Sequence, residues 1–254
     1  GQTRLYSIDV DDQGYVYLAT KWFRWGIVKD AMVHNTEPMK FVSQPGPFSD
    51  DVVSTLIVSL KASDGTYYAA IGDTVSSTLN LFDVTDRAHP QKRPNLRKSI
   101  YRYAKNSDGS VLGIATAGGR FELYTTDAFV ANSAPLINDA GADNAPVRAV
   151  ASDGVNFFVA ADSPNGLVIS TYAPNGSGGY YKVADFPTSR STLATESLKW
   201  GDGYLVQAGL TDGSYELRLF KATVANVSEV DLSIPAAPGY KAYYFKNYYV
   251  TNTS

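Results

Sequence analysis

Three aspartates at equivalent places in the chain are the residues whose chemistry is easiest to state. Asp73, Asp162 and Asp212 each follow a short run of apolar and small residues that is typical of a strand. Carboxylates that converge on one face can hold a hard cation such as calcium, or act as acid and base on a glycoside. Aspartate is also a favoured turn residue, because its side chain accepts a hydrogen bond from the backbone two residues on. We expect the turn role, keep the three as candidate ligand-binding residues, and predict no catalytic residue and no metal site.

The most unusual loop of the chain is rich in aromatic residues. Trp22, Phe23, Arg24 and Trp25 follow one another without a break. Exposed aromatic planes stack on sugars or on the side chains of a partner, and Trp and Arg are prominent in interface hot spots. Large aromatic side chains are more often buried, so Trp22 and Trp25 could instead fill the gap between two structural units. Both interpretations stay open, and we treat the four residues as a candidate ligand-binding patch.

Other motifs give no reaction. Residues 9–14, DVDDQG, begin like a calcium-binding loop, but the twelfth position is Thr20, where such a loop needs a bidentate glutamate. His34 and His89 lie in proline-containing loops and have no partner at the spacing of metal ligands. The chain has no cysteine, which excludes disulfides, thiolate metal sites and a cysteine nucleophile. We expect no cofactor.

Charge and composition narrow the class of partner. The net charge of −3 argues against binding to nucleic acid, which needs clustered Lys and Arg. The one basic run, residues 87–102, contains two prolines, so we expect a solvated connection there. No run approaches the roughly 18 apolar residues of a membrane span. The chain begins at Gly1 without a signal peptide, as an extracytoplasmic or cell-surface protein would after removal of its leader, and further domains could accompany it.

The elements that must position these residues follow a repeat. A turn glycine recurs at intervals of 44 to 51 residues, with an asparagine in its place at the end, at Gly14, Gly65, Gly109, Gly154, Gly203 and Asn247. Glycine and asparagine accept positive φ at low cost, as a two-residue hairpin turn requires. A period in the forties of short strands and turns is typical of a β-propeller and not of a sandwich.

Each unit has strands on both sides of this turn, and no segment shows a sustained helical period. The expected first strands are residues 5–9, 55–61, 100–104, 147–151, 196–200 and 240–245. The expected second strands are residues 15–20, 67–72, 111–116, 156–161, 204–209 and 248–253. The expected third strands are residues 26–32, 78–84, 120–126, 167–172 and 215–221. Fourth strands are weaker, at residues 39–42, 135–138, 180–186 and 227–234, and the second unit shows none between Asp86 and Leu96.

This unit resembles the repeats of WD40-type and related β-propellers. Residues 107–127, SDGSVLGIATAGGRFELYTTD, are similar to the inner three strands of such a repeat, although the Gly-His dipeptide and the closing Trp-Asp are missing. The resemblance implies one all-β propeller domain over residues 1–254, of about six blades, with the last blade incomplete or irregularly closed. It also implies that the loops between second and third strands share a face with those between fourth and first strands. Ligands meet propellers mostly on such a face.

We therefore expect a non-enzymatic binding module, exported or at the cell surface, that recognises a glycan or a protein through this loop face. Two alternatives stay open. The first is a glycan-active hydrolase or lyase that uses Asp73, Asp162 and Asp212. The second is a structural adaptor of a longer surface protein, docking through the tyrosine-rich residues 240–249.

Overall fold

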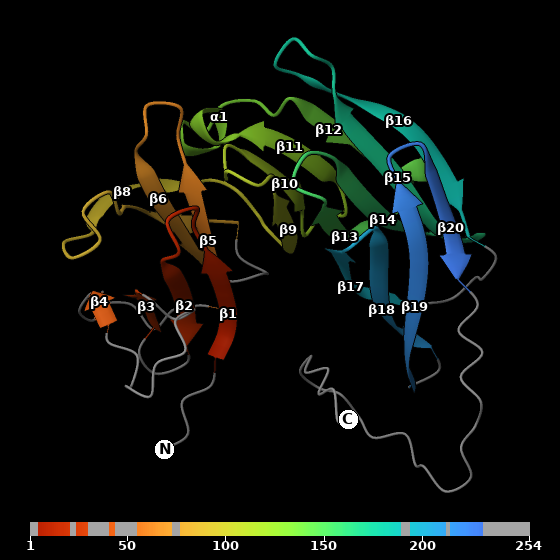
Figure 1. The fold of residues 1–254 in the computed structure, drawn as a ribbon, viewed down its shortest axis with the longest axis horizontal. Helices are drawn as coiled ribbons and strands as arrows, with labels where there is room; N and C mark the ends of the chain where they lie inside the picture. Colours follow the sequence, from red (N-terminus) through yellow and green to blue (C-terminus); the bar gives the residue numbers. More distant parts are fainter. Residues whose placement is uncertain are drawn as a thin grey trace, which may run out of the picture.

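The computed structural model describes residues 5–20, 24–29, 41–43, 55–72, 77–188, 194–211 and 214–230. Within these ranges the chain forms five antiparallel sheets of four strands each, and the strands of each sheet pair in chain order. The sheets, which we call blades 1 to 5, follow one another around an arc (Figure 1). The prediction of an all-β chain built from repeated four-strand units is confirmed. The expected sixth unit, residues 240–245 and 248–253, lies outside the described residues.

The strands have the following bounds. Blade 1 consists of β1 (Leu5–Val10), β2 (Val16–Thr20), β3 (Arg24–Val28) and β4 (Phe41–Ser43). Blade 2 consists of β5 (Leu56–Lys61), β6 (Tyr67–Gly72), β7 (Leu79–Asp83) and β8 (Gln91–Leu96). Blade 3 consists of β9 (Arg102–Lys105), β10 (Val111–Ala115), β11 (Phe121–Thr125) and β12 (Ile137–Asp139). Blade 4 consists of β13 (Val147–Ser152), β14 (Phe157–Ser163), β15 (Gly166–Pro174) and β16 (Tyr180–Pro187). Blade 5 consists of β17 (Ala194–Gly201), β18 (Tyr204–Thr211), β19 (Ser214–Thr223) and β20 (Asn226–Val230).

Two short helical segments complete the described fold. The helix α1 (Thr126–Val130) follows β11, and Thr125 caps it by accepting a hydrogen bond from the Ala128 N–H at 3.1 Å. A single 3-10 turn, Ala142–Asn144, precedes β13. Neither segment has the length to form a layer of its own, so the architecture is set by the sheets.

One prediction about the second unit is wrong. The segment after Asp86, which we expected to be a solvated connection without a strand, contains β8. Five of its six residues are exposed, so it is an edge strand with no apolar alternation to reveal it. The register between β7 and β8 shifts between Leu79 and Leu81, opposite Pro94. A proline is tolerated at such a place because an edge strand has no outer partner for the missing N–H.

The core lies between neighbouring blades and not within any one of them. One apolar cluster joins blades 1 and 2, with Tyr17 and Trp25 on one side and Ile57 and Phe82 on the other. Corresponding clusters join blades 2 and 3, 3 and 4, and 4 and 5. Strands packed on both faces carry apolar residues at successive positions, which explains why several second strands do not alternate.

The turn glycines have the conformation that the repeat predicts. The φ angles of Gly14, Gly65, Gly109, Gly154 and Gly203 are all positive, between 74° and 97°. The turns also connect the blades. The carbonyl of Gly109 accepts a hydrogen bond from the Lys61 N–H at 3.3 Å, and that of Gly154 accepts one from the Ser107 N–H at 2.9 Å. Each of these carbonyls therefore binds the hairpin of the preceding blade.

Because the four strands of each blade are antiparallel and pair in chain order, their connections lie at two opposite ends of the blade. The turns between first and second strands lie at the same end as the connections between third and fourth strands, which we call the turn end. The loops between second and third strands lie at the opposite end, the loop end, where we expected ligands. This assignment follows from the antiparallel order of the strands in each sheet.

We predict that Gly109→Ala lowers the free energy of unfolding by about 1–2 kcal/mol, because a Cβ at a left-handed position clashes with the backbone. Gly201→Ala is the matched control, since its φ is not positive and a Cβ there would meet nothing within 4 Å. Urea denaturation of both variants measures the difference. Equal losses would show that the handedness of the Gly109 turn is unimportant.

Candidate functional site

A pocket of about 220 Å³ opens at the turn end, over blades 1, 2 and 3. Its wall consists of residues 10–12 of blade 1, residues 59–61 and Tyr67 of blade 2, and residues 105–109 of blade 3. All of these residues lie at the ends of first strands, at the start of a second strand, or in the turns between them. Three rigid hairpins therefore form the pocket.

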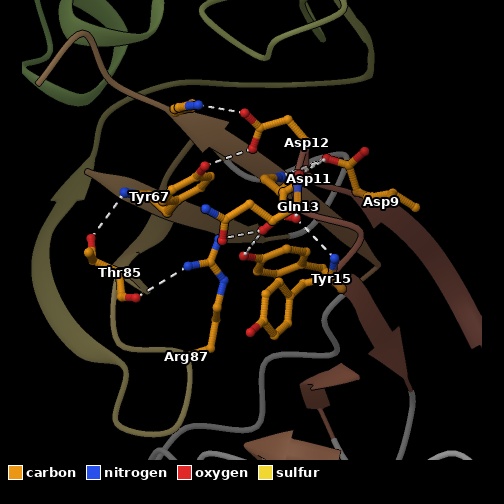
Figure 2. Close-up of polar contacts among 12 residues, drawn as sticks. Asp9, Asp11, Asp12, Gln13, Tyr15, Tyr67, Thr85 and Arg87 are labelled. Atoms are coloured by element: carbon orange, nitrogen blue, oxygen red, sulfur yellow. Dashed lines mark hydrogen bonds and ion pairs between the residues drawn. The ribbon is translucent and has the colours of Figure 1, made fainter. Parts of the chain in front are cut away.

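The wall on blade 1 is fixed by a buried ion pair (Figure 2). Asp11 accepts hydrogen bonds from the N–H groups of Gln13 and Tyr15 at 3.0 and 2.9 Å, so its carboxylate also shapes the turn. Its other oxygen accepts from Tyr17 Oη at 3.0 Å and from Arg87 Nη2 at 2.7 Å. The side chains of Arg87 and Asp11 are 8% and 4% exposed, so water does not screen the pair.

The Arg87 guanidinium is held on both faces by aromatic rings. Its central carbon lies 4.4 Å from the centre of the Tyr15 ring and 4.1 Å from that of Tyr67. Its Nη1 donates to the carbonyl of Thr85 at 3.2 Å. A planar cation between two rings and a carboxylate has one orientation. Arg87 therefore fixes blade 2 against blade 1.

Asp12, next in the turn, belongs to the rim of the pocket. It accepts a hydrogen bond from Tyr67 Oη at 2.8 Å and one from Lys61 Nζ. Burial alone would raise the pKa of Asp12, but the hydrogen bonds from Lys61 and Tyr67 and the Lys61 charge outweigh it and hold the pKa below 3.8. Asp12 is thus ionised at neutral pH, and its charge is matched by Lys61.

Lys105 joins three blades at the back of the pocket. Its ammonium lies 2.7 Å from Asp9 Oδ2, 3.1 Å from the carbonyl of Val10, and 3.0 and 2.7 Å from the carbonyl and Oγ of Ser59. Asp9 also accepts from the N–H and Oγ of Ser59 at 2.6 and 2.9 Å. The three protons of the ammonium are therefore engaged by the protein itself. The wall is rigid, and most of its charges are neutralised within it.

The structure places three of the predicted ligand-binding residues. Trp25 is 3% exposed, and its ring lies 4.9 Å from that of Phe82 in the cluster between blades 1 and 2. The indole of Trp25 thus packs in the core, as the alternative interpretation expected, and does not face a ligand. Arg24 lies in β3, and its side chain is not among the described ones.

Asp162 connects two blades. Its oxygens accept from Thr195 Oγ1 at 2.6 Å and from the Thr195 N–H at 3.1 Å, across the interface of blades 4 and 5. Arg148 lies 3.8 Å away. The remaining candidates, Trp22, Phe23, Asp73 and Asp212, lie outside the described residues, so a meeting of Asp162 with the other two aspartates stays a prediction.

Sequence reasoning missed the residues that build the pocket. The acidic turn at residues 9–14 drew attention only as an incomplete calcium loop. A signal was present, because Lys61 and Lys105 occupy the same place in the repeat, four residues before Gly65 and Gly109. Two lysines in register on neighbouring blades, next to an acidic turn, indicate pairing between blades. Arg87 carried no such signal, because nothing in the sequence distinguishes it from the exposed cations of the same run.

The described part of the chain lacks two further features. No three His, Cys, Asp or Glu side chains come together there in a way that could hold a metal ion. Among the same residues, no helix is long and apolar enough to cross a membrane.

Comparison with known proteins places the fold. No protein-family model matches the chain, and no curated protein matches it by sequence. Among solved structures it is similar to the β-propeller domain of Cps50 (Swd1) from Myceliophteria thermophila, at 13% identity and a TM-score of 0.50, over 88% of this chain and 72% of that one. The chain is a β-propeller. Since 891 solved chains match, the likeness identifies the fold and leaves the function to the site.

The propeller should depend on the Arg87–Asp11 pair. We predict that Arg87→Met lowers the free energy of unfolding by about 3–5 kcal/mol, because it leaves the Asp11 carboxylate buried without its cation. Arg93→Met is the matched control in the same blade, since Arg93 pairs with Asp83 but is 51% exposed. Exposed pairs contribute about 0–1 kcal/mol. Similar losses in the two variants, measured by urea denaturation, would contradict the role of Arg87 as a lock between blades.

The contribution of Asp12, at the rim of the pocket, to the free energy of unfolding should depend on pH. The pKa of Asp12 in the folded propeller lies below its unfolded value of 3.8, so its stabilising contribution is present above that pH and is lost as the pH falls through the folded pKa. Asp12→Asn should therefore unfold with a smaller dependence of free energy on pH than the parent chain as the pH falls below 3.8. Urea titrations at several pH values test this, and identical slopes would contradict it.

Proposed function

We propose that this propeller is a non-enzymatic interaction module whose partner is a polypeptide, bound at the turn end of blades 1 to 3. The observation that carries the proposal is the pocket of about 220 Å³, whose walls are held in place by ion pairs between three blades. A site that is rigid before binding loses little conformational entropy when a partner arrives. Sites that enclose a whole small ligand span about 300–1,000 Å³, so this volume better suits one anchoring side chain.

The charges at the rim of the pocket indicate which kind of side chain of the partner could enter it. Lys61 and Lys105 are engaged by Asp12 and Asp9, as described above. Asp108, by contrast, is exposed at the rim, and hydrogen bonds from Ser110 lower its pKa, so it is ionised at neutral pH. An exposed carboxylate beside a preformed pocket favours a basic guest. We expect a Lys or Arg side chain of the partner to enter there.

The glycan partner and the exported or surface location have less support. Stacking on sugars needs exposed aromatic planes. Of the aromatic patch, Trp25 is buried, and Trp22 and Phe23 lie outside the described residues. A glycan-active enzyme would need converging carboxylates, and both oxygens of Asp162 are occupied by Thr195. We therefore place a polypeptide partner first and retain the loop-end patch, the glycan and the surface location as predictions.

The test begins with capture of the partner. A photo-crosslinking amino acid replaces Ser107, which is exposed on the pocket wall. The control carries it at Gly201, which is exposed at the equivalent place of blade 5 and where a Cβ would meet nothing within 4 Å. We expect position 107 alone to capture a polypeptide from extracts of the source organism, and mass spectrometry then identifies it.

A charge-neutral substitution then measures the contribution of the rim. Asp108→Asn keeps the side-chain oxygen that accepts from the Ser110 N–H at 2.9 Å and removes the charge. Asp153→Asn is the matched control on blade 4, where Asp153 accepts from the Val155 N–H at 2.9 Å. We expect Asp108→Asn to weaken binding of the purified partner by about fivefold or more in calorimetry, and Asp153→Asn to leave it unchanged.

Two outcomes would replace the proposal. Equal capture at positions 107 and 201, or equal affinities of the two asparagine variants, would place the partner elsewhere on the propeller. Binding on a glycan array that quenches tryptophan fluorescence, without capture at position 107, would favour the glycan partner.

A further inference from the structure

Blade 1 has one face that no described residue covers. On β1, Ser7 and Asp9 point towards blade 2, where they accept hydrogen bonds from the Ile57 and Ser59 N–H groups. The alternating residues Tyr6, Ile8 and Val10 point the other way and are 41%, 56% and 42% exposed. The first strand of blade 2 is different, since five of the six residues of β5 are buried. The exposed face of β1 is therefore apolar where an interior blade would be packed.

Blade 5 has a matching face. Leu205 and Phe220 pack towards blade 4, in the cluster that joins the two blades. On the opposite face of the same strands, Leu217 is 58% exposed and Val206 is 38% exposed. Blades 1 and 5 lie at the two ends of the arc, so each has a single described neighbour (Figure 1). The two uncovered faces are those that the next blade around the ring would contact.

The chain itself supplies a segment suited to both faces. Residues 231–254 follow β20, and they contain the sixth hairpin that the repeat predicts, residues 240–245 and 248–253 around Asn247. This hairpin carries aromatic residues on both faces of its first strand, as a blade between two neighbours requires. The connection from Val230 to Tyr240 spans residues 231–239, which is within the range of the corresponding connections, from residues 97–101 after β8 to residues 44–55 after β4.

We propose that residues 240–253 of this chain dock between blades 5 and 1 as a sixth blade, and that they cover the exposed faces of both. The register follows from the contact of blade 1 with blade 2, where Asp9 meets Ser59. In the repeat, aligned on the turn glycine, Ala242 occupies the place of Asp9, and Ile8 occupies the place of Ser59. Ala242 therefore lies against Ile8.

The absence of cysteine from the chain allows a direct test. In the double variant Ile8→Cys, Ala242→Cys, mild oxidation of the folded protein should form an intramolecular disulfide. The control pairs Ala242→Cys with Val155→Cys, on the exposed turn of blade 4. A disulfide needs Cα atoms within about 7 Å, so we expect at least about tenfold more intramolecular product at 8–242 than at 155–242. In denaturant this difference should disappear.

The possible results separate the occupants of the face. Disulfides mainly between two chains would assign it to a second copy, and equal yields in the two variants would leave it without residues 240–253. Either result overturns the proposal. Labelling of single cysteines gives an independent measure, because Ile8→Cys should react with a maleimide at least about tenfold more slowly than Val155→Cys at any protein concentration, as a covered thiol does. Equal rates would also overturn it.

Discussion

The contact between neighbouring blades is the constraint on which the rest of this propeller depends. A sheet whose second strand is buried on both faces cannot be stable alone, so each blade obtains its core from the blades beside it. The clusters between blades supply the apolar part of this contact and are not directional. Hydrogen bonds between blades supply the directional part of the contact. These are the Asp9–Ser59 and Asp162–Thr195 hydrogen bonds and those that the turn carbonyls accept from the preceding hairpin. They fix the position of each blade, along the direction of its strands, relative to the next blade.

The buried Arg87–Asp11 ion pair costs desolvation free energy, and it also fixes the orientation of two blades. Removing two charges from water is expensive, and an apolar pair of similar volume is often no less stable. Here the cation is also sandwiched by Tyr15 and Tyr67, and the carboxylate shapes the turn through Gln13 and Tyr15. An apolar pair would fill the space without fixing the angle between blades 1 and 2. We infer that the pair defines the pocket geometry more than it adds stability.

Much of this fold could be predicted from the sequence, because its signals are local. Gly109 and Gly154 require positive φ, which marks their turns, and the strands on both sides follow from composition and period. The strand β8 could not be predicted, because an exposed edge strand needs neither alternation nor apolar residues. The residues of the candidate site were harder to predict than the strands. Whether Trp25 faces solvent or the core, and whether Arg87 is solvated or buried, depends on what the next blade places beside it, and no local pattern carries that information.

The position of the pocket follows from the same physics. Loops at the loop end are free to vary in length, which is why we expected a ligand there. The turn end is made of tight hairpins, and its side chains reach across to the neighbouring blade because the turns lie close together. Charged residues in these turns and at the strand ends beside them pair between blades, as Lys61 pairs with Asp12 and Lys105 with Asp9. A rigid, charge-paired wall around a small pocket is then a by-product of holding three blades together. The recognition that we propose at that end therefore needs no contacts beyond those that stabilise the fold, and a change that weakens the contacts between blades should also weaken binding there.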